Sequence, residues 1–179
     1  MKKMITLFCI AAAFAFSANA QVVGSNPGND NGRDTSAVNF SNQARMAGLK
    51  EIKASQLALQ KSHDQQIISF ATMMVNDHQK ANMELIKILR SEKYNVPTYR
   101  NGLGVTVDPM LTTTTGRNFD KNYVNMMVND HKMAVSLFTY AANNQLDPNL
   151  KAFAIKTLPT LKQHLAAIQA IATNMGLNP

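Results

Sequence analysis

The sequence predicts an all-α protein, a four-helix bundle with a long connection between its second and third helices. Apolar residues recur at spacings of three and four over four long segments, which is the period of a helix with one buried face. A stretch rich in glycine, proline and threonine separates the second segment from the third, and strand-like alternation is nearly absent. We expect the bundle domain to span residues 37–176.

The first 20 residues have the pattern of a secretory signal peptide. Lys2 and Lys3 precede an apolar run, which the small-residue sequence Ala18-Asn19-Ala20 closes. Cleavage after Ala20 would leave 159 residues with a formal charge of +5, because two lysines are also removed. It would also remove Cys9, the only cysteine, which excludes a disulfide scaffold, thiol catalysis and a cysteine-ligated metal site. We therefore expect an exported, periplasmic protein.

The basic composition does not indicate a nucleic-acid partner. The chain has 18 Lys and Arg against 11 Asp and Glu, but the basic residues are spread along the helices without an arginine cluster or interleaved aromatic residues. In an exported protein this charge favours association with anionic envelope surfaces. No segment after the signal peptide approaches the roughly 18 apolar residues of a membrane-spanning helix, and nothing indicates an oligomeric state.

The first two helices follow a polar tether. Residues 21–36 are rich in Asn, Gly, Asp and Ser, with almost nothing to bury, and are expected to be flexible. The first helix is predicted over residues 37–61, where small and apolar residues line one face. Ser62, with Gln65 three residues later, is the predicted capping box of the second helix, which ends near Lys93.

The connection over residues 94–116 is long enough to cross the whole bundle. It contains prolines, glycines and a run of four threonines, without a helical period. Fully extended, 23 residues reach about 76 Å, whereas a helix of about 30 residues is only about 45 Å long. We expect the crossover connectivity of ferritin-like folds, and the alternative is an up-down-up-down bundle with a wandering loop.

The last two helices are marked by their caps. The third is predicted to begin at an Asn118 cap and to end near Asn144. The fourth has the clearest start, with Asp147 as N-cap and Pro148 at the first helical position. Because proline lacks an N–H and clashes with the preceding turn, Pro159 is expected to kink this helix or to divide it in two.

Four polar residues interrupt the apolar stripes at the middle of the helices. The hexapeptide Met73-Met74-Val75-Asn76-Asp77-His78 recurs 53 residues later and ends at His131. Glu51 and His164 occupy comparable positions in the first and fourth helices. Because each residue is near the middle of its helix, all four fall in one layer whichever way each helix runs.

A buried carboxylate and three imidazoles are costly unless they bond to one another or to a cation. Carboxylate oxygen and neutral imidazole nitrogen suit first-row transition metals. We therefore predict that Glu51, His78, His131 and His164 bind a single ion of zinc, copper or iron. The alternative is a structural or interaction module in which these residues form a closed hydrogen-bond network that fixes the register of the helices.

A di-iron centre is not expected in this layer. Ferritin-like di-iron sites need four carboxylates and two Glu-x-x-His motifs. The residues three positions before the histidines are Val75, Val128 and Leu161, and Glu51 is the only glutamate in a buried stripe.

Methionines and aspartates flank two of the histidines. Met74 and Met127 lie one helical turn before them, and thioether with imidazole favours Cu(I), although methionines at this spacing are more often core residues. Asp77 and Asp130 directly precede the histidines. Such flanking residues are more often solvated than hydrogen-bonded to a metal-ligating imidazole.

Nothing in the sequence indicates a catalytic site. No serine or threonine belongs to a recognisable nucleophile motif, and no glycine-rich phosphate loop occurs. The remaining histidine and glutamates, His63, Glu84 and Glu92, are expected at the surface. We therefore expect metal handling or a role in envelope stress rather than catalysis.

Several features together match a known family. They are the small-residue helix around Glu51, the segments Met74–His78 and Met127–His131, Phe119-Asp120 with Tyr123, and the run from Leu158 to Leu165. With them, the stretch from Phe40 to about Met175 resembles the DUF4142 family of exported ferritin-like bacterial proteins, often labelled "predicted outer membrane protein". The resemblance implies a signal-bearing periplasmic four-helix bundle and supports the four layer residues as family-type positions. It implies no agreed function.

Overall fold

The computed structural model describes residues 35–94, 104–144 and 147–179. These residues form four long helices and one short one: α1 (Thr35–Lys61), α2 (Gln65–Ser91), α3 (Pro109–Thr113), α4 (Gly116–Asn144) and α5 (Pro148–Asn174). The predicted all-α class is confirmed, and the described ranges contain no strand. The predicted signal peptide and all but the last two residues of the predicted tether lie outside the described residues.

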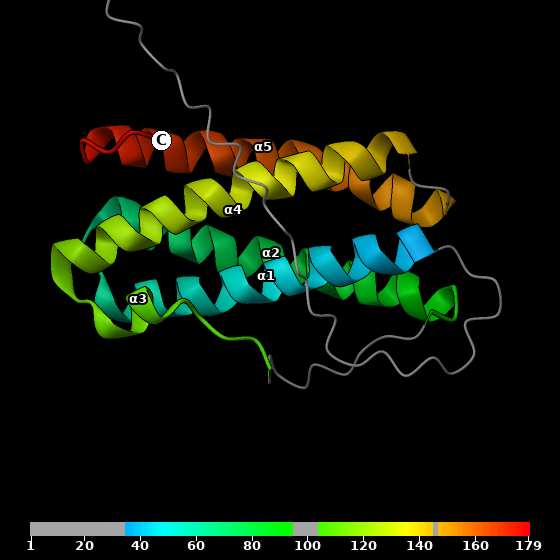
Figure 1. Cartoon of the computed structure of the whole chain (residues 1–179), viewed down its shortest axis with the longest axis horizontal. Coiled ribbons are helices and arrows are strands. Elements are labelled where there is room, and N and C mark those ends of the chain that lie inside the picture. The colour runs from blue at the N-terminus through cyan, green and yellow to red at the C-terminus, as the bar shows by residue number, and fades with distance from the viewer. Residues whose placement is uncertain (1–34, 95–103, 145–146) are drawn as a thin grey trace, which may run out of the picture. The chain divides into compact units, whose positions relative to one another are not determined.

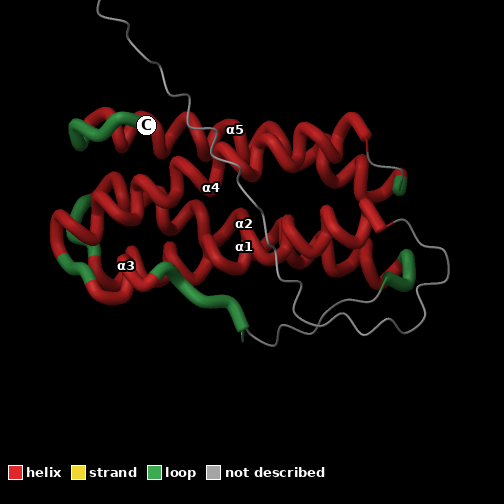
Figure 2. The backbone as a smooth tube through the Cα atoms, in the orientation of Figure 1, coloured by secondary structure: helices red, strands yellow, loops and turns green. Residues whose placement is uncertain are grey.

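The four long helices form a bundle with a crossover. α1 and α2 are antiparallel, α4 and α5 are antiparallel, and α2 and α4 run in the same direction (Figure 1). α1 packs against α4 and α2 packs against α5. The connection from α2 to α4 therefore starts at one end of the bundle and finishes at the other (Figure 2). This is the predicted ferritin-like connectivity.

The start of α2 differs from the prediction. Its N-cap is Asp64, whose Oδ1 accepts hydrogen bonds from the backbone N–H of Gln66 at 2.8 Å and of Ile67 at 3.4 Å. The predicted Ser62 capping box is wrong, because the helix begins at Gln65 and leaves Ser62 two positions too early. The Ser62 hydroxyl instead accepts from the N–H of Asp64 at 3.2 Å.

The starts of two other helices also differ from the prediction. α1 begins at Thr35, two residues before the predicted start, and α4 begins at Gly116 rather than after an Asn118 cap. Gly116 has a φ of 55°, a conformation that favours glycine, so it serves as the turn into α4. The predicted Asp147 cap is confirmed, since its Oδ1 accepts from two N–H groups of the first turn of α5 at 2.9 Å.

The short helix α3 was not predicted. It has only one turn, too short for a hydrophobic period, and is capped by the Asp108 carboxylate, which accepts from Met110 N at 2.9 Å. Lys61, the last residue of α1, holds α3 in place. Its ammonium donates to the carbonyls of Leu111, Thr112 and Thr114 at 2.8–3.0 Å.

Pro159 does not divide α5, which continues from Pro148 to Asn174. Of the two outcomes expected at Pro159, a kink or a division of the helix, division does not occur. Pro159 lies on the exposed face, and so does Ile155, whose carbonyl is the one that loses a helical donor. Water can hydrate a carbonyl on that face, so the helix tolerates the missing hydrogen bond.

Two apolar clusters fill the core, one on each side of a polar layer. The larger buried side chains of the first, the Phe70 cluster, are Ile67, Phe70, Met74, Leu111, Phe119, Tyr123, Met127 and Ile168. Those of the second, the Phe138 cluster, are Phe40, Leu85, Leu89, Phe138, Leu150, Phe153 and Leu161. In every long helix the predicted layer residue falls between the two clusters. None of the helices in the described ranges combines the length and apolar character needed to cross a membrane.

The N-cap assignment of α2 can be tested directly. Replacing Asp64 by alanine should lower the free energy of unfolding by about 1 kcal/mol, because two N–H groups of the first turn lose their acceptor. Ser62→Ala is the matched control and should cost less, because Ser62 accepts from one N–H outside the helix. Urea unfolding of the variants measures both effects. A larger loss for Ser62→Ala would contradict the assignment.

Candidate metal centre

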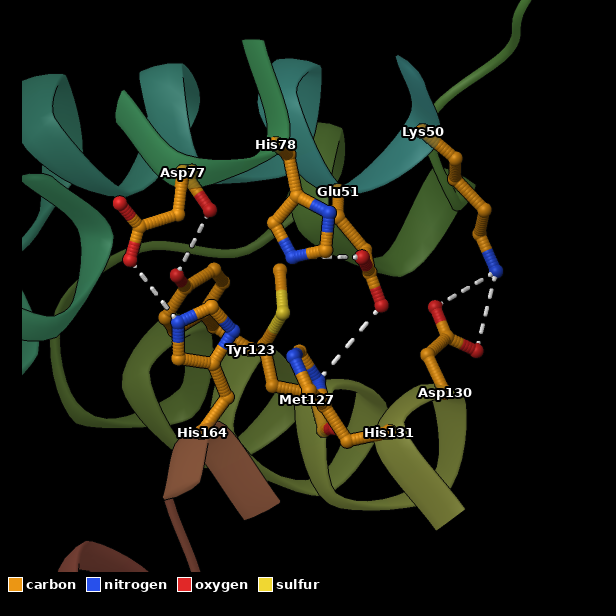
Figure 3. A network of polar contacts seen from close by, with 10 residues as sticks. Lys50, Glu51, Asp77, His78, Tyr123, Met127, Asp130, His131 and His164 are labelled. Carbon is orange, nitrogen blue, oxygen red and sulfur yellow. Dashed lines mark hydrogen bonds and ion pairs between the residues drawn. The ribbon is translucent and has the colours of Figure 1, made fainter. Parts of the chain in front are cut away.

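The polar layer contains one residue from each long helix. Glu51 on α1, His78 on α2, His131 on α4 and His164 on α5 are all buried, with exposed fractions of 1, 7, 0 and 2 %. Their side chains point toward one another across the centre of the bundle (Figure 3). The structure therefore brings together all four residues that the sequence places at mid-helix.

The three imidazoles form the compact part of the layer. One ligand nitrogen from each ring lies within 4.8 Å of the corresponding nitrogens of the other two, a spacing that could hold a metal ion. Glu51 reaches two of the rings. Its Oε2 lies 3.1 Å from His78 Nε2, and its Oε1 lies 3.5 Å from His131 Nδ1. The layer thus offers three nitrogens and a carboxylate beside two of them.

Hydrogen bonds fix the tautomers of two rings. His131 Nδ1 lies 2.9 Å from the carbonyl of Met127, which can only accept, so Nδ1 carries the proton. His164 Nε2 donates to Asp77 Oδ2 at 3.1 Å. The opposite nitrogens, His131 Nε2 and His164 Nδ1, therefore keep a lone pair. Both are buried without a hydrogen-bond partner in the protein.

Several polar atoms of the layer have no hydrogen-bond partner among the described residues. His78 Nε2 and Glu51 Oε1 are also buried without a hydrogen-bond partner, although each lies within ion-pair distance of a neighbour. The described part of the layer thus has three ring nitrogens and one carboxylate oxygen unpartnered. Leaving a buried polar atom unpaired costs about 1–3 kcal/mol. A ligand that binds these atoms together would remove that cost.

The two copies of the hexapeptide use their aspartates differently. Asp77 on α2 accepts from His164 on α5, whereas Asp130 on α4 pairs with Lys50 Nζ at 3.0 Å. The sequence placed both aspartates beside the histidine of their own helix. Asp77 does bind a layer imidazole, but one on a different helix, which a pattern within α2 does not reveal.

Burial sets the charge of the layer. It raises the pKa of Glu51 to about 8, with the negative charge of Asp130 adding to the rise and Lys50 opposing it. Burial lowers the pKa of His78 to about 3 and that of His131 to about 4, and neighbouring imidazoles add to both shifts. The pKa of His164 is lowered by burial and held up by Asp77. At neutral pH the rings are therefore neutral, the state that binds metals.

Other polar groups around the layer were missed at the sequence level. Ser55 and Tyr123 share a buried hydrogen bond of 2.9 Å, and burial raises the pKa of Tyr123. Asn82 is also buried, one helical turn after His78. Asn82 could have been recognised from the sequence, because it lies four residues after His78 and residues four apart share a helix face.

The residues expected at the surface lie outside the layer. His63 is exposed, whereas Glu84 and Glu92 are half-buried. The carboxylate of Glu84 pairs with Lys156 Nζ at 2.8 and 2.9 Å. Glu92 accepts a hydrogen bond from Asn149 Nδ2 on an exposed face. These three residues are therefore separate from the layer and can serve as controls for it.

The shifted pKa values predict a stability maximum for the metal-free protein near pH 6.5. The three rings contribute stability above their unfolded pKa of about 6.5, and it is lost as the pH falls toward their lower folded values. Glu51 contributes stability below its unfolded pKa of 4.5, and it is lost as the pH rises through about 8. Thermal unfolding followed by circular dichroism across pH 3–9 measures this profile.

The matched variants are Glu51→Gln and Glu84→Gln. Glu51→Gln cannot ionise and should lose the decline between pH 6.5 and 8. Glu84→Gln, at the surface, should keep it. An unchanged alkaline decline in Glu51→Gln would contradict the assignment of that decline to Glu51.

Solved structures with the same fold provide a comparison. A DUF305 protein from Streptomyces coelicolor, described as secreted, is 12% identical, with a TM-score of 0.67 over 80% of this chain and 95% of its own. CopM in its Cu(II)-bound form is 18% identical, with a TM-score of 0.65 over 77% and 96%. CopM in its Cu(I)-bound form is likewise 18% identical, with a TM-score of 0.64 over 79% and 98%.

At these identities the similarity shows the fold alone. A comparison with curated proteins returned no match. A family model covers most of the described bundle. The model of the domain of unknown function DUF4142 matches residues 24–171, and the chain belongs to that family.

Proposed function

We propose that this protein binds one transition-metal ion at the centre of its bundle, through His78, His131 and His164 with Glu51 as the fourth ligand. The observation that carries the proposal is the set of three neighbouring imidazoles, each with a buried nitrogen that has no hydrogen-bond partner. Imidazole nitrogen with one carboxylate is a donor set for zinc, copper and iron. One ion would bond all four unpartnered groups at once.

The distances are compatible with this role after a small adjustment. In a tetrahedral arrangement, nitrogens bound to one ion at about 2.1 Å lie about 3.4 Å apart. One nitrogen from each ring lies within 4.8 Å of those of the other two rings, so binding requires the rings to approach one another by up to about 1.4 Å. The bound ion would also displace the proton of Glu51, whose ionised carboxylate would then offset part of its charge.

The proposed role is metal handling or protection of the envelope, outside the cytoplasm. The basic and apolar start of the sequence has the pattern of a signal peptide. One protein of the same fold, that of Streptomyces coelicolor, is described as secreted. Both points support export, with cleavage near Ala20.

Metal stoichiometry tests the proposal. The purified mature chain, equilibrated with zinc, copper or iron salts and passed through a desalting column, should retain one ion per chain by mass spectrometry. His78→Ala combined with His131→Ala should reduce retention to background, because two of three nitrogens are lost. His63→Ala, at the exposed histidine, should retain the full ion.

The competing function is a structural module in which the layer only fixes helix register. The two contacts of Glu51 with His78 and His131 favour it. It predicts no metal above background in the unmodified chain. It also predicts that the double variant loses the same thermal stability with and without added metal. Either result would overturn the metal-binding proposal.

A second, weaker candidate within this proposal is a Cu(I) site that also uses the methionines beside the layer. Met74 and Met127, one turn before His78 and His131, are fully buried. In Figure 3 the Met127 side chain extends from α4 toward His78. Thioether sulfur is a soft ligand that selects Cu(I). Structures of the same fold were solved with Cu(I), Cu(II) and silver bound to CopM.

Methionine variants separate copper from zinc. Met127→Leu and Met74→Leu nearly conserve volume and should weaken Cu(I) binding about tenfold or more while leaving zinc binding unchanged, because zinc does not require a thioether. Met133→Leu, at a position that is 63 % exposed, is the control and should change neither. Competition with a Cu(I) chelator measures the affinity. Equal Cu(I) affinity in all three variants would exclude thioether ligation.

A further inference from the structure

A cavity of about 40 Å³ adjoins the polar layer on the side of the Phe138 cluster. Glu51, His78 and His164 line it, so three of the four proposed metal ligands border the same space. A single water needs about 10–15 Å³ of such volume. The cavity therefore has room for a ligand of two or three atoms beside the layer.

One polar side chain outside the layer lines this cavity with an unpartnered donor. Asn82, one turn after His78 on α2, is 8 % exposed, and its Nδ2 is buried without a hydrogen-bond partner. A buried amide N–H is costly to leave unpaired. The two carboxylates on the cavity wall, Glu51 and Asp77, already face imidazoles. The group that Asn82 lacks is an acceptor inside the cavity.

Gly48 on α1 makes the position of Asn82 feasible. A Cβ added at Gly48 would lie 2.9 Å from both Nδ2 and Oδ1 of Asn82, closer than such atoms approach in proteins. Only glycine therefore leaves space for this amide between α1 and α2. The other wall residues include the apolar or small Ala44, Ala134 and Phe153 and the hydroxyl-bearing Thr157 and Thr160. They limit the ligand to a small size.

We propose that this cavity binds a small exogenous ligand of the metal. The ligand is water, hydroxide or an inorganic anion of two or three atoms. It takes a fifth coordination position on the ion, beside the four protein ligands, and accepts a hydrogen bond from Asn82 Nδ2. The inference rests on the proposed metal site, because the second bond to the small ligand comes from the metal ion. A positive ion beside neutral imidazoles favours an anionic ligand. Asn82 is the specificity-determining residue, because it provides the only unpartnered buried donor among the described cavity-lining residues outside the layer.

Azide is the probe for this site. The Cu(II)-loaded full mature chain is titrated with sodium azide, and the azide-to-copper charge-transfer absorption is followed. One azide should bind per copper. Asn82→Leu keeps the side-chain size but lacks the donor, and it should weaken azide binding about tenfold while copper remains at one per chain. Asn76→Leu, at an exposed position on the same helix, should leave azide binding unchanged.

Gly48→Ala is a second variant, which tests the role of the Asn82 amide even if Asn82→Leu does not fold. It retains the amide but displaces it, so azide binding should also weaken, with copper still at one per chain. Absence of copper in the unmodified chain overturns the proposed metal site itself. Normal copper binding without azide binding, or equal azide affinity in the unmodified chain and in either cavity variant, overturns the ligand site alone.

Discussion

The burial of one carboxyl group and three imidazoles in a single layer is the constraint on which the rest of the bundle depends. Each long helix places one of these residues between two apolar clusters, so every helix has a fixed axial position. Burial keeps the rings neutral and Glu51 protonated at neutral pH. The layer nevertheless leaves buried nitrogen and oxygen atoms unpartnered, which apolar packing alone does not explain. The cation that we propose would account for both the burial and the missing partners.

The crossover determines how the repeated hexapeptide is used. Because α2 and α4 run in the same direction (Figure 1), Met74 and Met127 both fall in the Phe70 cluster, on the same side of the layer. Each copy then meets a different neighbour. α5 brings His164 to Asp77, and α1 brings Lys50 to Asp130. One copy therefore orients an imidazole of the layer, while the other places a charge pair beside Glu51. Identical sequences have diverged in role through their surroundings.

The fold and the four layer residues could be predicted because both depend on periodicity and on position along a helix. Counting from helix ends was enough to place Glu51 and the three histidines at one height. Contacts between side chains of different helices could not be predicted from position along a helix. The bond from His164 to Asp77 and the close approach of Gly48 to Asn82 depend on rotation and spacing of neighbouring helices. Local geometry also decided the Asp64 cap, where the sequence pattern pointed to Ser62, and the one-turn helix α3, which is too short to show a hydrophobic period.

X-ray absorption at the zinc K-edge, on the zinc-loaded full mature chain, reports which atoms surround the ion. We expect a single environment with three imidazole nitrogens at about 2.0–2.1 Å, recognised by the outer-shell scattering of the rings, and one oxygen donor. A shell of oxygen donors without imidazole scattering would contradict this expectation, because the ion would then be bound outside the histidine layer.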